Sequence, residues 1–563
     1  MKSTPKDATL ASHKLLYQAG FIRESVAGHY YFLPLGWRVH QKIQQIVKKH
    51  MDASGAQEII SPVLHPKYLW EETNRTTSVG FELMTIKDRS EMEFVLGGTG
   101  EEMLVDLVRK FQISYKDLPF NLYQISSKFR DEARARGGLL RVREFFMKDA
   151  YSFDANEEAF KKEYQKMWDL YTTIFKEMGL ETVVVESDNG YIGGEYCHEF
   201  VVVSDAGESK FYVTEDGTYA AHEDVAKFKR DEKNVTDKEE VMKEVDAMRG
   251  TTMEDGIKLH GLPMWQQMKD FMMVDENGRM ILAVVRGDFD VNETKVLHVA
   301  KAYQLRHATD DEIRNIGSEP GFISPVGLKE KAQKKGIELL IIGDTSLRTV
   351  KNMYTGANEM HKDLTNVNID RDYTVDVEAD IALAREGDVA ENGGVLQTRK
   401  GVEVGNIFQL GFHYTSRMKD ATYTDENGEK QPYYMGCYGI GLGRTLATIV
   451  EVSHDDKGII WPASVAPYDV HVIMIGSHKE VLTPLVEKLE QAGLEVLFDD
   501  REDVSPGERF ADADLLGMPV RLIISDKSIE KGGIEVKERA ADGSEIVHPD
   551  VVLDKVMQIL GKK

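Results

Sequence analysis

The sequence changes character twice, near Glu223 and near Lys400, and this interruption constrains the fold more than any other feature. Before Glu223 the chain alternates strands with long loops, and residues 199–214 have the pattern of a β-hairpin. An acidic, polar stretch then leads into apolar runs that alternate with helical segments, and the earlier pattern resumes after Lys400. We therefore expect one domain to be inserted into another. The apolar runs of the inserted block lie at 280–288, 338–344 and 374–384.

The residues after Pro467 show a third pattern, in which short apolar runs alternate with helices. Such an alternation predicts a compact α/β module, so the expected fold class is a multidomain combination of α/β and α+β. The predicted strands of the module lie at 469–476, 494–500 and 520–525, and its helices end at Gln491 and Leu516. The expected segments are the first part of a core (1–223), an inserted α/β domain (224–400), the second part of the core (401–464) and a C-terminal α/β domain (465–563).

The composition narrows the class of protein. A length of 563 residues suits roughly three or four domains, and 42% hydrophobic residues allow each a core of its own. Cys197 and Cys437, the two cysteines, cannot build a disulfide framework, so we expect a cytoplasmic protein in a reducing compartment. Because no apolar run approaches the ~18 residues of a membrane span and the N-terminal residues lack the pattern of a secretory signal, no membrane partner is expected.

The formal net charge is −25, from 95 acidic and 70 basic residues. Binding of nucleic acid depends on local basic surface and not on this sum. Residues 128–148 contain seven basic and three acidic side chains, whereas residues 231–255 contain nine acidic and four basic ones. A nucleic-acid partner is therefore compatible with the sequence, although each run also fits an ordinary solvated face.

Glycines cluster between Gly436 and Arg444, directly before an apolar helix at 445–450. A dinucleotide-binding loop would need a third glycine where Arg444 stands, and the phosphate loop of common NTPases is absent. Closely spaced glycines before a helix let backbone approach a flat ligand, and an arginine at the helix start can cover that ligand. The alternative is a glycine-rich packing contact.

A second cluster begins with Phe129-Arg130-Asp131-Glu132 and continues through an arginine-rich loop to Phe145. An arginine at a strand end, a basic loop and a returning aromatic ring suit a triphosphate beside a stacked base. Taken alone, the pattern also fits an ordinary basic hairpin. The further arginines of the loop are Arg134, Arg136, Arg141 and Arg143.

Together these motifs resemble the three motifs of class II aminoacyl-tRNA synthetases. A helix over 36–53 with a strand ending at Pro62 is similar to motif 1, the FRDE-to-REF segment to motif 2, and GIGLGR to motif 3. The loop Thr99-Gly100-Glu101 and the string MGCYGIGLGR are similar to those of bacterial prolyl-tRNA synthetases. The inserted block resembles their editing domain, and residues 465–563 resemble the anticodon-binding domain of the prolyl, threonyl, histidyl and glycyl enzymes.

The resemblance implies an antiparallel-sheet core that condenses proline with ATP and transfers the prolyl group to tRNA. Arg130 and Arg444 are then the expected catalytic residues, with Arg130 against the α-phosphate and Arg444 over the adenine opposite Phe145. Mg²⁺ is expected on the ATP phosphates, and no protein metal ligand is assigned. The resemblance also implies a homodimer, since motif 1 forms the class II dimer interface. Further expected ATP-binding residues are Glu132, Arg141, Phe145 and Gln409.

For proline, the resemblance implies that Thr99 and Glu101 bind the secondary ammonium. Met147, Tyr151 and Phe408 are expected as an apolar wall around His413. We interpret His198 as a core histidine and the two cysteines as packing residues. The expected tRNA contacts are Arg134 and Arg136 for the acceptor stem and Asp500, Arg501, Lys537 and Arg539 for the anticodon.

A proline pocket cannot exclude the smaller alanine by sterics, so a second, hydrolytic site is expected in the inserted block. Lys269 and the loop from Gly321 to Pro325 match editing residues of the family. Where the family has a histidine this chain has Asp363, with His361 two residues earlier. His361 is the candidate for that role, and whether the loop uses His361 or Asp363 stays open. Two alternatives stay open: a synthetase for threonine, serine or glycine, and a synthetase-like protein that binds RNA without catalysis.

Overall fold

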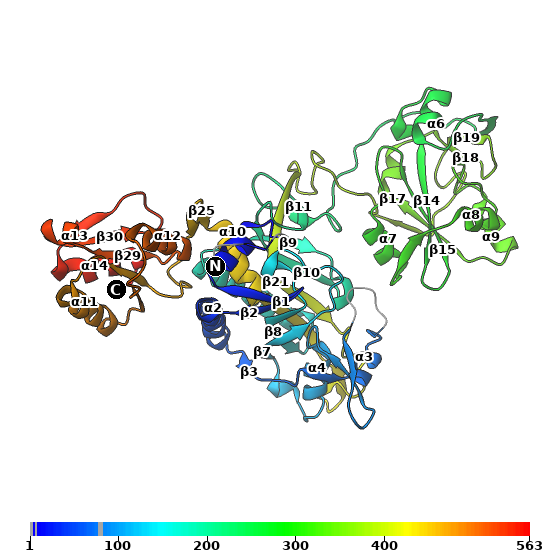
Figure 1. Ribbon diagram of the computed structural model, residues 1–563. Helices are drawn as coiled ribbons and strands as arrows, with labels where there is room; N and C mark the ends of the chain where they lie inside the picture. The colour runs from blue at the N-terminus through cyan, green and yellow to red at the C-terminus, as the bar shows by residue number, and fades with distance from the viewer. Residues whose placement is uncertain (1–3, 6–7, 77–82, 563) are drawn as a thin grey trace. The chain divides into compact units, whose positions relative to one another are not determined.

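The computed structural model describes residues 4–5, 8–76 and 83–562, and the chain folds into two compact units (Figure 1). The first unit contains residues 1–184, 189–209 and 400–563, and the second contains residues 185–188 and 210–399. The second unit thus begins before residue 224. The reason is that Tyr212 and Ala221, on the paired strands β11 (Ser209–Val213) and β12 (Ala220–His222), pack into its hydrophobic core.

An antiparallel sheet forms the centre of the first unit. Strands β7 (Phe120–Phe129), β8 (Glu144–Asp154), β24 (Tyr434–Gly441) and β21 (Gln397–Gly411) are neighbours in that order, and all three pairings are antiparallel. The short strand β3 (Gln57–Glu58) adds a parallel edge beside β7. Apolar faces of three helices pack on the sheet in one core: α2 (Pro34–Ala53), α5 (Glu157–Glu177) and α10 (Leu442–Val452).

The hairpin predicted over residues 199–214 is wrong. Strand β10 (Tyr196–Val203) pairs with β21, and β11 pairs with β12, so the two halves of the segment do not pair with each other. The turn itself is present, because the Gly207 amide donates to the Ser204 carbonyl. Gly207 packs so closely on the Gly401 backbone that a Cβ would lie 2.0 Å from it, and this contact replaces the expected cross-strand pairing.

Smaller elements surround one end of this sheet. Helix α1 (Ala11–Gln18) is followed by the hairpin β1 (Ile22–Val26) and β2 (His29–Phe32). A three-stranded sheet has the order β4 (Leu64–Pro66), β6 (Glu93–Leu96), β5 (Thr85–Lys87). Helices α3 (Lys67–Glu72) and α4 (Glu101–Val108) pack beside it through Leu69, Trp70 and Leu104.

The second unit has a five-stranded sheet with apolar side chains on both faces. Helix α7 (Glu293–Ala300) lies on one side of this sheet and helices α8 (Asp310–Ile316) and α9 (Leu328–Lys334) lie on the other (Figure 1). Alternate residues of β14 (Met268–Asp275) and β15 (Met280–Arg286) enter different cores: Met272 and Leu282 pack with α8 and α9, whereas Met273 and Ile281 pack with α7. The strand order is β16 (Leu305–His307), β14, β15, β17 (Leu339–Asp344) and β20 (Val377–Ala379). A second sheet has the order β13 (Lys243–Asp246), β19 (Lys362–Val367), β18 (Met353–Gly356), and α6 (Met253–His260) follows β13.

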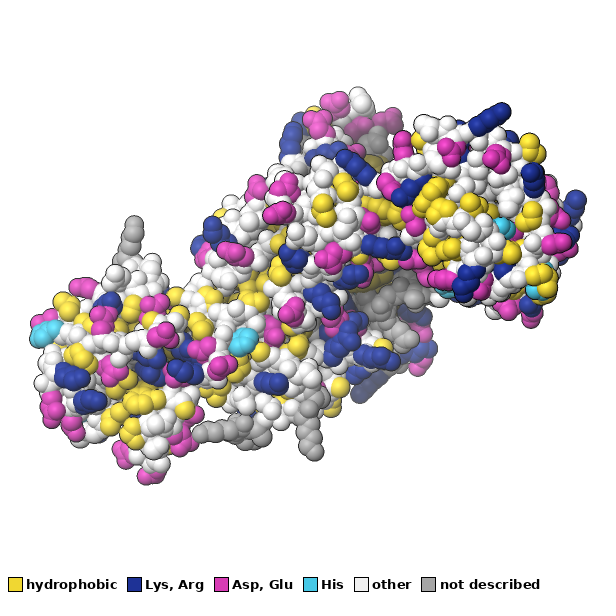
Figure 2. All heavy atoms as spheres, turned by 90° about the horizontal axis from the view of Figure 1, so that it is seen from above, with side chains coloured by type: hydrophobic (Ala, Val, Ile, Leu, Met, Phe, Trp, Pro, Cys, Tyr) yellow, Lys and Arg dark blue, Asp and Glu magenta, His cyan; other side chains and the backbone are white. Residues whose placement is uncertain are grey.

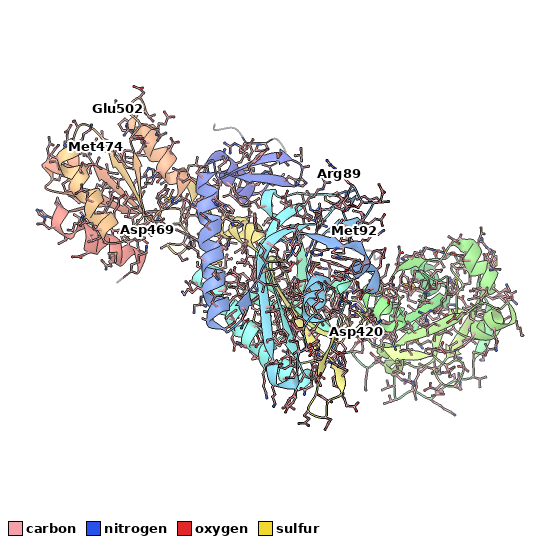
Figure 3. All side chains as sticks on the ribbon, turned by 90° about the horizontal axis from the view of Figure 1, so that it is seen from below. Arg89, Met92, Asp420, Asp469, Met474 and Glu502 are labelled. Carbon is pink, nitrogen blue, oxygen red and sulfur yellow. The ribbon has the colours of Figure 1, made fainter. Side chains whose placement is uncertain are left out.

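The C-terminal residues of the first unit form the predicted α/β module. Its sheet has the order β28 (Val496–Asp499), β27 (Val470–Met474), β29 (Val520–Ile524), β30 (Ile534–Glu538), β31 (Glu545–Val547). Its helices are α11 (Lys479–Gln491), α12 (Pro506–Leu516), α13 (Asp526–Glu530) and α14 (Val552–Leu560). In Figure 3, Asp469 and Met474 mark the two ends of β27, and Glu502, in the loop after β28, lies at the Met474 end.

Within the described residues, no helix combines the length and the apolar character that crossing a membrane requires. Figure 2 shows acidic and basic side chains interspersed over the visible face, so the charge of −25 is not gathered into one acidic surface there.

Candidate active site

A cavity of about 410 Å³ lies beside the central sheet of the first unit. Its wall brings Glu132 and Arg141, from the loop between β7 and β8, together with Arg444 in the first turn of α10. Arg136 from the same loop, Glu403 on β21 and Glu208 complete its charged lining. Three of the predicted ATP-binding residues, two from one loop and one about three hundred residues later in the sequence, therefore share one cavity of a size suited to a nucleotide.

Each arginine of this cavity is held by a carboxylate. Arg141 donates twice to Oε2 of Glu132, at 3.0 and 2.7 Å, and once to Glu208 at 3.1 Å. Arg444 donates from Nη1 to Glu403 at 3.0 Å and from Nε to the Leu140 carbonyl at 2.9 Å. Because each guanidinium donates from two of its nitrogens, its plane is fixed before a ligand arrives. The sequence motifs gave no signal for Glu208 or Glu403.

Arg130 follows directly after β7 and lies between two parts of the site. Its Nε donates to the carbonyl of Gly98 at 3.2 Å, one residue before Thr99. Its guanidinium lies 5.2 Å from the centre of the Phe145 ring and 5.9 Å from that of Tyr191, within the range of cation–π contact. The pairing of Lys128 with Phe145 across β7 and β8 sets this arrangement. The predicted ATP contact Gln409 is instead buried on β21, where it donates to Tyr434 at 2.5 Å and to Glu195.

The predicted proline-binding loop is buried at the start of α4. Thr99 donates to Oε1 of Glu101 at 2.8 Å, and the Cys437 thiol donates to the same oxygen at 3.2 Å. The backbone amide of Gly100 donates to the Tyr151 hydroxyl at 2.8 Å, and Tyr151 donates to Asp149 at 2.9 Å. Thr99, Glu101 and Tyr151 are thus connected in one network. Cys437 belongs to this polar contact as well as to the packing role assigned to it.

Two charged residues that the sequence analysis missed adjoin this loop. Glu102 is fully buried, and Arg75 donates to its Oε1 at 2.8 Å and to Oε2 of Glu101 at 3.4 Å. Burial raises the pKa of Glu102, and the Arg75 guanidinium opposes this effect. The adjacent pair Glu101-Glu102 was the available signal, because two carboxylates in one buried turn need a cation.

The other predicted wall residues lie close by. Phe408 and Tyr151 pack in one apolar cluster with Cys197 and Cys437, whereas Met147 is half-buried on β8. Burial lowers the pKa of His413 to about 4, so its ring is neutral and suited to an apolar wall. His198 accepts or donates a 2.8 Å bond with the Tyr164 hydroxyl, and burial lowers its pKa to about 4, as expected for a core histidine.

The residues predicted to contact tRNA differ in their exposure and in whether they already form ion pairs within the protein. Arg134 is exposed on the loop after β7, and Arg136 forms an ion pair with Glu208. In the C-terminal module Arg501 is bound by Asp499 and Asp512 at 2.7 and 2.8 Å. Arg539 is 7% exposed and holds Asp455 at 2.6 Å, so its guanidinium serves an internal ion pair. Asp500 is exposed and Lys537 is half-buried on β30.

In the second unit the loop from Gly321 to Pro325 is held from several sides. Gly321 has φ of +80°, and a Cβ there would lie 2.3 Å from Thr251, so the position requires glycine. Asn358 donates to the carbonyls of Ser324 and Val326, both at 3.0 Å. Pro325 is buried in this loop, and the ring of the exposed His361 lies 5.8 Å from that of Phe322.

Asp363 is engaged in an ion pair that reaches the same loop. Arg249 donates to both carboxylate oxygens of Asp363, at 2.7 and 2.6 Å, and His260 bonds Oδ2 at 2.8 Å. Burial raises the pKa of Asp363, but the hydrogen bonds from His260 and Arg249 lower it overall. Arg249 also donates to the Gly321 carbonyl at 3.2 Å and covers the Phe322 ring at 4.4 Å.

Lys269 does not join this loop. Its ammonium donates to Asp290 and to the Phe289 carbonyl, both at 2.8 Å. Because side chains alternate along β14, Lys269 shares the face of Phe271 and Met273, whereas Ile323 packs against the opposite face. The structure thus brings together Gly321, Pro325 and His361 and separates Lys269 from them.

Asp270, the next residue on β14, faces the loop. Thr355 Oγ1 lies 3.0 Å from Asp270 Oδ2 and 3.2 Å from the Ile323 carbonyl. A hydroxyl has one proton to donate, so both contacts are satisfied when Asp270 is protonated and donates to Thr355. Burial raises the pKa of Asp270 to about 7, which agrees with this arrangement.

We expect Asp270→Asn to stabilise the protein at alkaline pH and to have little effect at acid pH. The pKa of the Asp270 carboxyl is about 7 in the folded chain and about 3.9 in the unfolded chain. The free energy of unfolding of the wild-type protein therefore decreases as the pH rises from about 3.9 to about 7, by up to about 4 kcal/mol. Asparagine does not titrate and avoids this loss. Calorimetric unfolding at about pH 5 and about pH 8 measures the difference. A stability gap that does not change with pH would contradict the assignment.

Comparison with known proteins identifies the family. The sequence model of the tRNA synthetase class II core domain (G, H, P, S and T) matches residues 84–453, and that of an anticodon binding domain matches residues 469–559. A proline–tRNA ligase from a Sulfurihydrogenibium species is 42% identical over 562 residues, covering 99% of this chain and 97% of the relative. A proline–tRNA ligase from Bacillus pumilus is 42% identical over 566 residues, covering 99% and 98%.

Among solved structures, Giardia lamblia prolyl-tRNA synthetase in complex with prolyl-adenylate has a similar fold. Its TM-score is 0.59 at 15% identity, over 97% of this chain and 78% of that chain. The class II core and the anticodon-binding domain predicted from the motifs are therefore confirmed. With a core model that matches most of its length and relatives 42% identical from end to end, the chain belongs to the proline–tRNA ligases, a family of class II aminoacyl-tRNA synthetases.

Proposed function

We propose that the first unit activates proline with ATP and transfers the prolyl group to a proline-specific tRNA. The position of Arg130 is the observation that carries this proposal. Its guanidinium bonds Gly98, beside the buried Thr99–Glu101 loop, and it begins the loop that lines the nucleotide cavity. A cation at this point can neutralise charge where a bound carboxylate meets the α-phosphate.

In the first step, an oxygen of the proline carboxylate attacks the α-phosphorus in line, and pyrophosphate leaves. Arg130 stabilises the charge that develops on the non-bridging oxygens, and Glu101 holds the ammonium group. Phe145 and Arg444 sandwich the adenine. In the second step a terminal hydroxyl of the tRNA attacks the adenylate carbonyl, and AMP leaves. Positioning and electrostatics provide the catalysis, with no covalent enzyme intermediate.

Mg²⁺ enters this proposal as part of the nucleotide substrate. The described residues contain no group of three or more His, Cys, Asp or Glu side chains that could hold a metal ion. Phosphate oxygens therefore supply most of the ligands, which suits a small, hard cation that keeps few protein ligands. The cavity wall offers the carboxylates of Glu132 and Glu403 as additional oxygen donors.

Pyrophosphate exchange with ATP across a panel of amino acids tests the proposal. We expect exchange to depend on proline and to be far weaker with threonine, serine or glycine. Stronger exchange with one of these would favour the alternative synthetase. No exchange with any amino acid, together with retained tRNA binding, would favour a synthetase-like RNA-binding protein.

We further propose tRNA contacts and a dimer. Arg134 and Arg136 extend from the loop that lines the cavity and are suited to phosphates of the acceptor stem. The segment that follows α2 exposes Ile60 at 83%, Val63 at 37% and Leu64 at 40%, and such an apolar patch favours a second copy of the chain. Sedimentation should give twice the monomer mass, and Ile60→Asp should shift it toward the monomer.

The second unit is proposed to hydrolyse alanyl-tRNA at the Gly321–Pro325 loop. The support is that this loop is held rigidly by Arg249, Thr355 and Asn358 within a unit that has cores of its own. Rigid placement of a loop is what a hydrolytic site requires.

We expect Arg249→Gln to slow alanyl-tRNA hydrolysis by roughly tenfold or more, because the loop loses its contacts at Gly321 and Phe322. Lys269→Ala should have a smaller effect, since its ammonium lies on the other face of the sheet. Deacylation of purified alanyl-tRNA measures both. If Lys269→Ala slowed alanyl-tRNA hydrolysis more than Arg249→Gln, the hydrolytic centre would lie on the face of the sheet that carries Lys269 and Asp290.

A further inference from the structure

Two adjacent carboxylates are buried at the start of α4, and the guanidinium of Arg75 lies closer to one of them than to the other. Glu101 and Glu102 are both fully buried in the first turn of the helix. Arg75 lies 2.8 Å from Glu102 but 3.4 Å from Glu101. The guanidinium is therefore bonded mainly to Glu102.

Aromatic rings hold Arg75 in this position. Its guanidinium lies 4.9 Å from the ring centre of Trp70 and 5.4 Å from those of Tyr191 and Tyr414. Ring faces stabilise a desolvated cation, which makes its burial at 5% exposure affordable. Thr73 also donates to the Glu102 oxygen that Arg75 binds, at 2.9 Å. The pair is thus fixed from both sides.

A count of buried charge shows what the pair leaves over. Arg75 and Glu102 cancel, and Lys128 cancels Asp149 at 2.9 Å, with all four side chains buried. The buried Lys148 does not bond these carboxylates, because its ammonium donates to the Tyr171 hydroxyl and to the Tyr438 carbonyl. Glu101 remains with one negative charge, with hydrogen bonds from the neutral donors Thr99 and Cys437, and with the longer 3.4 Å contact from Arg75. A buried charge is costly unless it is paired, so this pocket is completed by a single cation from the substrate.

We propose that Arg75 and Glu102 are positioning residues for amino-acid recognition: Glu102 neutralises Arg75, so that Glu101 keeps its negative charge for the substrate ammonium. This inference rests on the proposed role of Glu101. Without the Glu102 charge, Arg75 would turn to Glu101 and compete with proline for the same oxygen.

The test compares Glu102→Gln with the double variant Arg75→Gln/Glu102→Gln in pyrophosphate exchange. The single variant should raise the KM for proline roughly 10- to 100-fold and leave the KM for ATP unchanged. The double variant removes both charges, so Glu101 is again uncompensated and the KM for proline should return to within about threefold of the parent. If Arg75 and Glu102 had a purely structural role, the KM for proline should be higher in the double variant than in the single variant.

An uncharged analogue separates charge from shape. Tetrahydrofuran-2-carboxylate has a ring oxygen in place of the proline nitrogen, so its inhibition constant should be the same in the parent and in Glu102→Gln. Weaker inhibition in the variant would mean a distorted pocket and would overturn the inference. Glu102→Asp, which retains the charge, is the second variant should Glu102→Gln fail to fold, and its KM for proline should stay near that of the parent.

A matched control and a separate variant complete the design. Arg109→Gln breaks the ion pair with Glu72, which also joins α3 to α4 but is partly exposed, and should leave the KM for proline unchanged. Glu101→Gln tests the underlying proposal. An unchanged KM for proline in Glu101→Gln would show that Glu101 does not bind the substrate ammonium. A raised KM there, combined with a normal KM in Glu102→Gln, would leave that partner in place and overturn only the inference.

Discussion

Arg130→Ala should reduce proline-dependent pyrophosphate exchange by roughly 10²- to 10³-fold while the protein stays folded, a loss of about 3–4 kcal/mol of transition-state stabilisation. The reason is that Arg130 begins the loop that lines the nucleotide cavity and also bonds Gly98, beside the buried Thr99–Glu101 turn. Alanine leaves the phosphate charge without a cation at that point. Exchange rates at saturating proline and ATP, with thermal unfolding as the folding check, measure the effect.

The control for this variant is Arg89→Ala. Arg89 is an exposed arginine in the turn between β5 and β6, and it is not among the residues that line the cavity. Its removal subtracts the same charge and should leave exchange unchanged. Near-normal exchange in Arg130→Ala would show that another group neutralises the α-phosphate.

Joining Ser209 to Lys400 through a short Gly/Ser linker should leave proline activation within about threefold of the parent and abolish alanyl-tRNA hydrolysis. Both ends of the cut lie on one spot of the first unit, because the Ser204 amide donates to the Lys400 carbonyl at 3.0 Å and Gly207 packs on Gly401. The removed unit has its own cores, and strands β7, β8, β24 and β21 stay in the core of the first unit, although the sheet loses β12 and most of β11.

Two assays decide this prediction. Pyrophosphate exchange reports activation, and deacylation of purified alanyl-tRNA reports hydrolysis. Deacylation that survives the removal would move the hydrolytic site to the first unit. A loss of both activities with a cooperative unfolding transition intact would mean that the nucleotide cavity depends on the removed residues.

Much of the fold could be predicted from residue spacing. The apolar positions Val39, Ile43 and Val47 recur at helical intervals, and the structure has the helix α2 there. The strands and helices of the C-terminal module lie within a few residues of their predicted places, because each is bounded by turn residues or by a helix cap. The hairpin at 199–214 failed for a different reason. The turn itself was predicted correctly. The strand that pairs with β10 is β21, however, which lies roughly two hundred residues later in the sequence and cannot be found from a local pattern.

The site could be predicted where a motif carries it and not elsewhere. Arg130, Arg141 and Arg444 belong to motifs; Arg141 and Arg444 line the cavity, and Arg130 begins the loop that contributes to its wall. Arg75 lies in an irregular segment after α3, and only the fold brings it to Glu102. The separation of Lys269 from its predicted partners could not be predicted, because only the fold shows which face of β14 the Gly321–Pro325 loop packs on.

The contact between Gly207 and Gly401 also has a genetic consequence. A segment whose ends meet on the surface of its host adds little loop-closure entropy, whatever its length. The coding sequence for such a segment can be gained or lost in one event without a compensating change in the host. Other domains should therefore be able to replace the inserted segment in the first unit. Gly207 and Gly401 mark the positions next to which such gene fusions should succeed.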